Sequence, residues 1–248
     1  MSGTAIGGKA AVLRALHHDR AADDPLVLPG PWDAASAKVF ADAGFPALAT
    51  PSSGVSASLG YPDGQGTPPA EMFAAIRRIT RAVDVPVSAD VEAGYGLPAA
   101  ELVERLLEAG AVGCNLEDSD PATGALRDPD AQAEFLAQVR AAAGDALVLN
   151  ARVDTYLAGA DRTPAAAIAR GRRYAEAGAD VIYPILAAPQ ALGLIAEGVG
   201  LPVNALCKPG GPAPRELGVF GATRVTFGGG MQHQAMDDLR VTAEALRG

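Results

Sequence analysis

A short pattern that recurs three times constrains the fold of this chain more than any other feature. In DAGFPALATPS, EAGAVGCNLED and EAGADVIYPIL, a helical segment ends at an Ala-Gly pair and a short apolar run follows. The glycines, Gly44, Gly110 and Gly178, suit the left-handed residue that closes a helix, and they are 66 and 68 residues apart. Each interval is long enough for two strand-and-helix units. The repeat therefore predicts an α/β chain in which strands and helices alternate.

Eight short runs that are apolar and rich in β-branched residues or alanine are typical of strands. They span residues 26–30, 46–50, 85–90, 112–117, 146–152, 180–186, 201–206 and 223–228. Helical patterns occupy residues 34–43, 70–83, 98–109, 130–143, 163–177 and 188–197, and another at 232–247 follows the last strand. These alternations predict a parallel sheet that closes into a single (β/α)8 TIM-type barrel over residues 1–248. An open doubly wound sheet is the rival, but LPGPWDAAS follows the first strand where a Gly-x-Gly-x-x-Gly turn would stand.

The composition excludes several classes of protein. The formal net charge is −9 and the 20 basic residues form no cluster, which argues against nucleic-acid binding. No apolar stretch approaches the roughly 20 residues of a membrane span, and the start of the chain lacks the pattern of a signal peptide. Cys114 and Cys207 lie in apolar strand-like runs and suggest no disulfide framework. We therefore expect a cytoplasmic protein that binds a small molecule and neither nucleic acid nor a membrane.

Polar residues follow most of the predicted strands at their carboxyl ends, where barrels of this kind carry their chemistry. Asp90, Glu92 and Glu117 are the most informative, because three converging carboxylates would repel one another unless they shared a cation. Oxygen ligands favour Mg2+ or Mn2+ over zinc, and no histidine falls at a strand end. The alternative is that each carboxylate separately caps a helix or forms a surface ion pair. We interpret the three residues as ligands of one divalent metal.

Two further features of the same ends predict substrate binding. Arg152 ends the strand ALVLNAR, where a guanidinium would pair with a carboxylate of the protein or of the substrate. Residues 52–54, Ser-Ser-Gly, form a predicted small-residue turn that would offer backbone N–H and hydroxyl donors to an anionic group. An ordinary flexible loop is the alternative for that turn.

Four stretches, in this order, resemble the isocitrate lyase and phosphoenolpyruvate mutase superfamily: GFPALATPSSGVSASLGYPDG, PVSADVEAGYG, NLEDS and NARVD. The likeness runs from about residue 25 to residue 228, and four motifs at consistent spacing are far more specific than any one of them. The resemblance implies a (β/α)8 barrel with Mg2+ at its mouth. It also implies that the last helix is exchanged between the subunits of a dimer or tetramer.

The resemblance further implies roles for single residues. Asp90 matches the principal metal-binding aspartate, Glu92 a second acidic position and Glu117 the glutamate of the next strand. Asp63 in the GYPD turn matches another acidic position near the metal, and Tyr95 in the GYG turn matches a tyrosine close to the site. The candidate catalytic residues are Asp63, Glu92, Tyr95, Glu117 and Arg152. The candidate substrate-binding residues are Thr50, Ser52, Ser53, Gly54, Asp90, Arg152 and Asn204.

The segment after the fourth strand departs from the best-known enzymes of the superfamily. Isocitrate and methylisocitrate lyases carry a Lys-Lys-Cys-Gly-His gating loop there, and phosphoenolpyruvate mutase and phosphonopyruvate hydrolase carry Lys and Asn. This chain reads DSDPATGALRDPD, without lysine, cysteine, histidine or asparagine. The usual forms of those reactions are therefore not expected.

The chemistry common to the superfamily remains, in which Mg2+ chelates the 1-carboxylate and 2-oxygen of a substrate and stabilises an enolate. We expect a Mg2+-dependent lyase or decarboxylase that cleaves a C–C bond of a small 2-oxo or 2-hydroxy carboxylic acid. Glu92, Glu117 and Tyr95 are unranked candidates for proton transfer.

Other functions stay open at this point. One is a mutase or hydrolase reaction at a P–C bond. Another is the binding of a 2-oxo acid without turnover. A class I aldolase would use Lys208 as its Schiff-base lysine. The glycines 228–230 form either a phosphate cradle or a plain turn.

Overall fold

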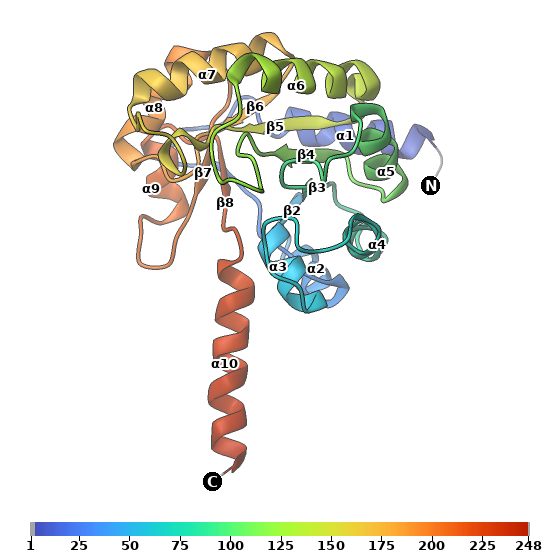
Figure 1. Cartoon of the computed structure of the whole chain (residues 1–248). Coiled ribbons are helices and arrows are strands. Elements are labelled where there is room, and N and C mark those ends of the chain that lie inside the picture. The colour runs from blue at the N-terminus through green and yellow to red at the C-terminus, as the bar shows by residue number, and fades with distance from the viewer. Residues whose placement is uncertain (1–2, 248) are drawn as a thin grey trace.

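Short parallel strands form the centre of the molecule, which we describe for residues 3–247 of a computed structural model (Figure 1). The strands are β1 (Leu26–Val27), β2 (Leu48–Thr50), β3 (Val87–Asp90), β4 (Gly113–Leu116), β5 (Val148–Arg152), β6 (Val181–Tyr183), β7 (Asn204–Leu206) and β8 (Arg224–Thr226). Each lies inside one of the predicted ranges and is shorter than that range. Residues 1, 2 and 248 of the predicted domain lie outside the described residues.

The strands close into a barrel. Parallel pairing runs β2-β3-β4-β5-β6 in one sheet and β1-β8-β7 in the other. A parallel bridge between Ile182 and Val203 joins β6 to β7, and the backbone N–H of Ala49 donates to the carbonyl oxygen of Pro29 at 3.1 Å, beside the end of β1. All carboxyl ends therefore meet at one rim, and the predicted (β/α)8 architecture is confirmed.

Helices alternate with the strands along the chain and lie outside them in space (Figure 1). They are α1 (Gly3–Ala15), α2 (Ala34–Asp42), α3 (Ser52–Leu59), α4 (Pro69–Thr80), α5 (Ala99–Glu108), α6 (Pro129–Ala143), α7 (Pro164–Glu176), α8 (Leu192–Val199), α9 (Pro214–Val219) and α10 (Gly230–Arg247). Short 3₁₀ turns η1 (Gly144–Ala146), η2 (Asp154–Tyr156) and η3 (Pro189–Ala191) join some of them to their neighbours. No helix in the described part of the chain is both long and apolar enough to span a membrane.

Helix α3 corrects the prediction for residues 52–54, which form its first turn and not a small-residue loop. The sequence SSGVSASL is poor in strong helix formers, so local propensity does not indicate a helix. Packing decides instead, because Ser52, Gly54, Val55 and Ser56 are all buried. The first N–H groups of a helix have no partner within it, so this segment still offers donors at the barrel rim.

Helix α10 extends away from the barrel (Figure 1). Leu239, Val241 and Leu246 on this helix are 58%, 66% and 84% exposed, which is unusual for large apolar side chains in a group. The predicted exchange of this helix between subunits stays a prediction.

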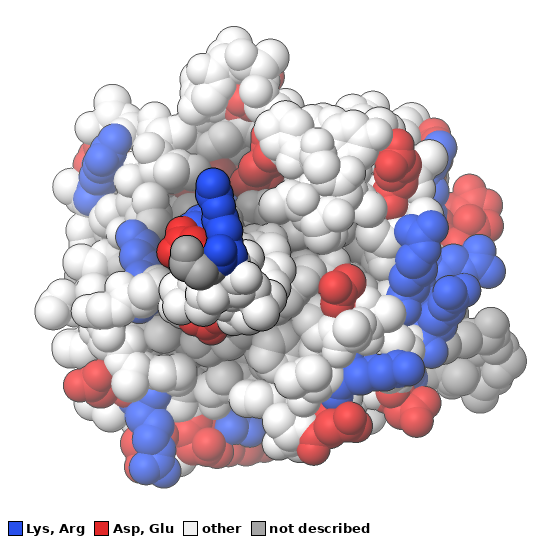
Figure 2. All heavy atoms as spheres, turned by 90° about the horizontal axis from the view of Figure 1, so that it is seen from below, with Lys and Arg blue, Asp and Glu red and all other residues white. Residues whose placement is uncertain are grey.

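Charged residues are mixed on the face seen along α10. Figure 2 shows basic and acidic side chains around the edge of this face, with several basic side chains gathered at its right. The expectation that the chain binds no nucleic acid stays a prediction.

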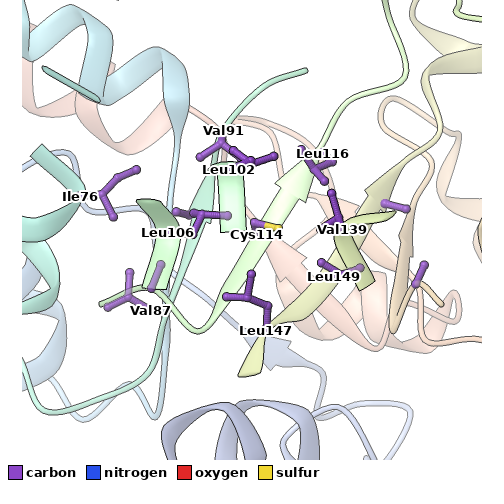
Figure 3. Close-up of a cluster of buried hydrophobic side chains, with 14 of the residues drawn as sticks. Ile76, Val87, Val91, Leu102, Leu106, Cys114, Leu116, Val139, Leu147 and Leu149 are labelled. Atoms are coloured by element: carbon purple, nitrogen blue, oxygen red, sulfur yellow. The ribbon is translucent and has the colours of Figure 1, made fainter. Parts of the chain in front are cut away.

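The main hydrophobic core lies between the outer faces of the strands and the helices. In Figure 3, Cys114 of β4 lies among Leu102 and Leu106 of α5 and Val139 of α6. Inside the barrel, Leu13 of α1 packs with Leu26 and other apolar side chains and fills the end opposite the rim. The alternating strand positions leave the inward-facing residues near the rim free to carry polar groups.

Candidate active site

A cavity of about 280 Å³ opens at the carboxyl ends of the strands. The predicted site residues on its wall are Thr50, Ser52, Ser53, Asp63, Asp90, Glu117 and Arg152. Asn115, Tyr183 and Thr226 also line it, and the sequence did not single them out. Larger hollows of about 740 and 490 Å³ lie outside the barrel, beside α4 and α5. We place the chemistry in the rim cavity, because charged residues from several strand ends converge there.

Asp90 ends β3, and this partly exposed residue lies on the wall of the cavity. Its backbone N–H donates to Thr50 Oγ1 at 3.4 Å, and the backbone N–H of Glu92 donates to its Oδ1 at 3.0 Å. Burial raises the pKa of Asp90, while Arg152 and hydrogen bonds from Glu92 and Asn115 oppose that rise. The charged form therefore lacks the stabilisation it would have in water, and a bound cation would restore it.

Arg152 ends β5 and joins two carboxylates at the same rim. Its Nη1 donates to Glu117 Oε1 at 2.6 Å and its Nε donates to Asp154 Oδ1 at 2.7 Å. The guanidinium carbon lies 5.6 Å from the centre of the Tyr183 ring. Burial alone would lower the pKa of Arg152, but Glu117, Asp154 and Asp90 raise it, so the side chain keeps its charge. Its remaining N–H groups are free to bind an anion in the cavity.

Glu92 is turned away from the cavity and holds a neighbouring loop. It has a left-handed backbone, with φ of 51°, and its carboxylate accepts hydrogen bonds from Tyr95 Oη at 3.0 Å and from the backbone N–H of Gln65. Burial raises the pKa of Glu92 to about 7. The loop of residues 60–66 that it fixes carries Asp63 to the cavity wall. Strained backbone of this kind persists where the surroundings hold it, often at functional sites.

Four predicted site residues thus lie off the cavity wall: Gly54, Glu92, Tyr95 and Asn204. A side chain at Gly54 would place Cβ 3.0 Å from Pro51 Cγ and 3.3 Å from Gln232 Cβ, so this glycine serves the packing of α3 against α10. Asn204 is fully buried and donates to Thr226 Oγ1 at 2.9 Å. These residues support the cavity from behind.

The glycines 228–230 and Lys208 also have clear positions. Gly228 lines the cavity, and a Cβ at Gly229 would lie 2.7 Å from Ser53 Oγ, so the turn packs tightly against the first turn of α3. Lys208 is exposed and borders a surface hollow beside α10, not the rim cavity. A Schiff-base mechanism at Lys208 therefore gains no support from its position.

The side chains of the three predicted metal ligands, Asp90, Glu92 and Glu117, differ in their surroundings. Within residues 3–247, no three His, Cys, Asp or Glu side chains form a ready-made metal-binding group, because Glu92 faces the 60–66 loop and Glu117 is paired with Arg152. The cavity nevertheless has an excess of carboxylates over its one guanidinium. Mg2+ fits such a site, since it commonly takes one or two carboxylates directly and keeps several waters.

A closed barrel with a carboxylate-rich rim defines an enzyme of the (β/α)8 class, and comparison with known proteins makes this more specific. The sequence model described as phosphoenolpyruvate phosphomutase matches residues 13–247, so the chain belongs to this family, within the phosphoenolpyruvate mutase and isocitrate lyase superfamily.

Three similar proteins illustrate the range of the family. A solved protein of Burkholderia cenocepacia, provisionally assigned as a phosphonomutase, is 40% identical with a TM-score of 0.87, covering 95% of this chain and 99% of its own. The 2-methylisocitrate lyase of Halalkalibacterium halodurans is 30% identical over 89% of this chain and 74% of its own. Phosphonopyruvate hydrolase, solved with oxalate and Mg2+, is 23% identical with a TM-score of 0.83, covers 96% and 87%, and shows the shared fold.

Proposed function

We propose that this protein is a Mg2+-dependent lyase or decarboxylase that cleaves a C–C bond in a small 2-oxo or 2-hydroxy carboxylic acid. The observation that carries the proposal is the cavity, about 280 Å³ in volume, where Asp63, Asp90 and Glu117 face a single guanidinium, that of Arg152. This volume suits a small acid. The likeness to a 2-methylisocitrate lyase supports C–C chemistry.

Different residues of the rim would bind the metal ion and the substrate. Asp90 would hold Mg2+ directly, and Asp63 and Glu117 would hold it through its waters. A bound Mg2+ would supply positive charge that stabilises negative charge developing on the substrate oxygens. Arg152, oriented by Asp154, would bind a substrate carboxylate through its free N–H groups. The first turn of α3 would bind the far anionic end of the substrate, because helix N-termini favour negative charge.

Glu117 is the best placed of the proton-transfer candidates. It lies on the cavity wall, whereas Glu92 and Tyr95 hydrogen-bond to each other behind it. A group that exchanges a proton with the substrate must come within hydrogen-bonding distance of it. We therefore assign Glu117 to this step and give Glu92 and Tyr95 the role of holding the 60–66 loop.

Chemistry on a P–C bond is the second candidate. Its support is the 40% identity to the protein provisionally assigned as a phosphonomutase, together with Gly228 on the cavity wall near the N-terminus of α3. A phosphonate would bind there as a carboxylate would.

One screen separates these candidates. Oxaloacetate, phosphonopyruvate, methylisocitrate and dimethylmalate are supplied with Mg2+, and the release of pyruvate, glyoxylate and phosphate and the formation of phosphoenolpyruvate are measured. C–C cleavage gives pyruvate or glyoxylate without phosphate. Phosphate or phosphoenolpyruvate from phosphonopyruvate would replace our first proposal by the second, and binding without turnover of any substrate would contradict both.

A matched pair of variants assigns the activity to the site. Asp90→Asn keeps the size of the side chain and removes the charge, and it should abolish Mg2+-dependent turnover. Asp42→Asn, at an exposed position at the end of α2, should leave turnover unchanged. Full activity in Asp90→Asn would show that the site is assigned wrongly.

We also propose that α10 is exchanged between subunits of a dimer or tetramer. Its support is the projection of α10 from the barrel and the exposure of Leu239, Val241 and Leu246 (Figure 1). A second subunit would cover these side chains.

A further inference from the structure

A polar cluster lies inside the barrel on the inner side of Asp90. It consists of Ser88 on β3, Asn115 on β4, Asn150 on β5 and Arg224 on β8, and none of the four is more than 5% exposed. Interiors of such barrels are usually filled by Val, Ile and Leu. Burying polar groups is unfavourable unless they are hydrogen-bonded, so this cluster calls for a specific role. We call it the interior polar cluster.

Arg224 is the unusual member of this cluster, because it is fully buried and no carboxylate within residues 3–247 forms a salt bridge with it. Its Nη2 donates to Asn115 Oδ1 at 3.3 Å and to Ser88 Oγ at 3.4 Å. Its Nε and Nη1 are buried without a partner among the described residues. Burial lowers the pKa of Arg224 to about 10, so it is charged at neutral pH. The structure therefore retains an unpaired buried cation at a stability cost.

The contacts of Arg224 decide which way the Asn115 amide points. Asn115 Oδ1 accepts from Arg224 Nη2 and also from Asn150 Nδ2, at 2.7 Å. A guanidinium has donors only, so the atom of Asn115 that faces it must be the oxygen. Asn150 alone would not decide this, because its own amide can turn and offer an oxygen instead. Arg224 is thus the member that removes the ambiguity.

The orientation of the Asn115 amide matters at the rim, because it leaves the amide nitrogen on the side of Asp90. Asn115 is the register partner of Asp90 on the neighbouring strand, and both residues line the cavity. Asn115 lowers the pKa of the Asp90 carboxyl and so favours its charged form. The reverse orientation would set the amide oxygen against a carboxylate oxygen, which is repulsive. A fixed donor of this kind orients a metal-binding carboxylate without neutralising it, as outer-shell partners of metal ligands generally do.

We propose that Arg224 is a positioning residue of the active site, which fixes the amide of Asn115 so that its N–H group holds the Asp90 carboxylate in its metal-binding orientation. The proposal rests on the proposed binding of Mg2+ by Asp90. It assigns a role to a residue that contacts neither the cavity nor the substrate.

Mg2+ affinity, measured by calorimetry without substrate, tests this role. Arg224→Gln keeps a polar side chain but can present an oxygen, so the Asn115 amide is free to turn, and Mg2+ should bind about 10- to 100-fold more weakly. Arg224→Lys offers donors only and should bind Mg2+ within about threefold of wild type. Ser88→Ala removes the other hydrogen-bond partner of Arg224 and should leave Mg2+ affinity unchanged.

Steady-state kinetics adds a readout that general damage to the fold would not give. At saturating Mg2+, kcat of Arg224→Gln should return close to that of wild type, because only metal binding is impaired. Wild-type Mg2+ affinity in a folded Arg224→Gln variant would overturn the proposal. Absence of Mg2+ binding by the wild-type protein would instead overturn the proposed function, and the metal-binding role of Arg224 with it.

Neutron diffraction from wild-type crystals exchanged into D2O decides the orientation without any variant. We expect two deuterons on the Asn115 atom that faces Asp90 and none on the atom that faces Arg224. The opposite arrangement would refute the proposed role of Arg224 even if Mg2+ binds at Asp90. This measurement also stands if the Arg224 variants fail to fold.

Discussion

His17 makes the stability of the barrel sensitive to acid. The ring is 3% exposed, its Nδ1 lies 2.8 Å from the carbonyl oxygen of Leu13, and its Nε2 is buried without a partner among the described residues. Burial, and then the charge of Arg224, lower the pKa of His17 from 6.5 to about 3. Because the folded-state pKa lies below the unfolded one, acid protonates the unfolded chain first. Stability is therefore intact above about pH 6.5 and is lost as the pH falls toward 3.

The two pKa values set the size of the effect. Linkage between 6.5 in the unfolded state and about 3 in the folded state predicts a loss of about 2 kcal/mol in the free energy of unfolding at pH 5, and about 3 kcal/mol at pH 4, relative to pH 8. This is a substantial part of the total stability of an ordinary domain.

Urea unfolding of a matched pair of variants measures this loss. His17→Asn places an amide nitrogen where Nδ1 stands and removes the titration. From pH 8 to pH 5 the free energy of unfolding of wild type should therefore fall by about 2 kcal/mol more than that of the variant. His18→Asn, at the next and exposed position, should follow wild type at every pH. The buried carboxylates titrate alike in all three proteins. A difference in the free energy of unfolding between wild type and His17→Asn that is the same at pH 8 and pH 5 would refute the reasoning.

Three further changes test the rim, the interior and α10. Arg152→Lys loses the paired contacts to Glu117 and Asp154, so kcat/KM should fall about 100-fold and the melting temperature should fall as well, and a drop in kcat/KM under tenfold would contradict its role. Gly113→Ala places Cβ 2.9 Å from Leu13 Cδ2 and 3.1 Å from both Ser88 Oγ and Val148 O. It should lower the unfolding free energy by about 1–3 kcal/mol in chemical denaturation, and no loss would mean that the barrel interior relaxes around the added methyl group. Deleting residues 230–248 should convert the proposed dimer or tetramer to a monomer in light scattering, and an unchanged oligomeric state would exclude helix exchange.

The fold was predictable because its signals are local. Gly44, Gly110 and Gly178 all have the left-handed backbone that the Ala-Gly pattern indicates, with φ of 90°, 83° and 95°. Each apolar run is long enough to mark one strand. Helix α3 escaped prediction because its stability comes from burial against the rest of the molecule, which composition does not reveal.

The site was predictable in position but not in orientation. Strand ends placed Asp90, Glu117 and Arg152 on the cavity wall, as the resemblance also implied. Nothing in the run ADVEAGYG indicates that Glu92 turns at φ of 51° toward the 60–66 loop. Asn115 escaped notice because it lies within a strand, yet polar residues at inward positions of otherwise apolar strands were a usable signal.

The segment after β4 is part of a fixed rim, and this bears on how the site excludes water. Residues 119 and 126 form an antiparallel bridge, and Asp120 Oδ1 accepts from the backbone N–H groups of Ala122 and Thr123, both at 2.9 Å. At its start, Asp118 is fully buried and accepts from Tyr174 Oη at 2.7 Å. A segment held this way along its length is a poor gate. The 60–66 loop, which brings Asp63 to the cavity wall and is held through Glu92, is likewise a fixed part of this rim.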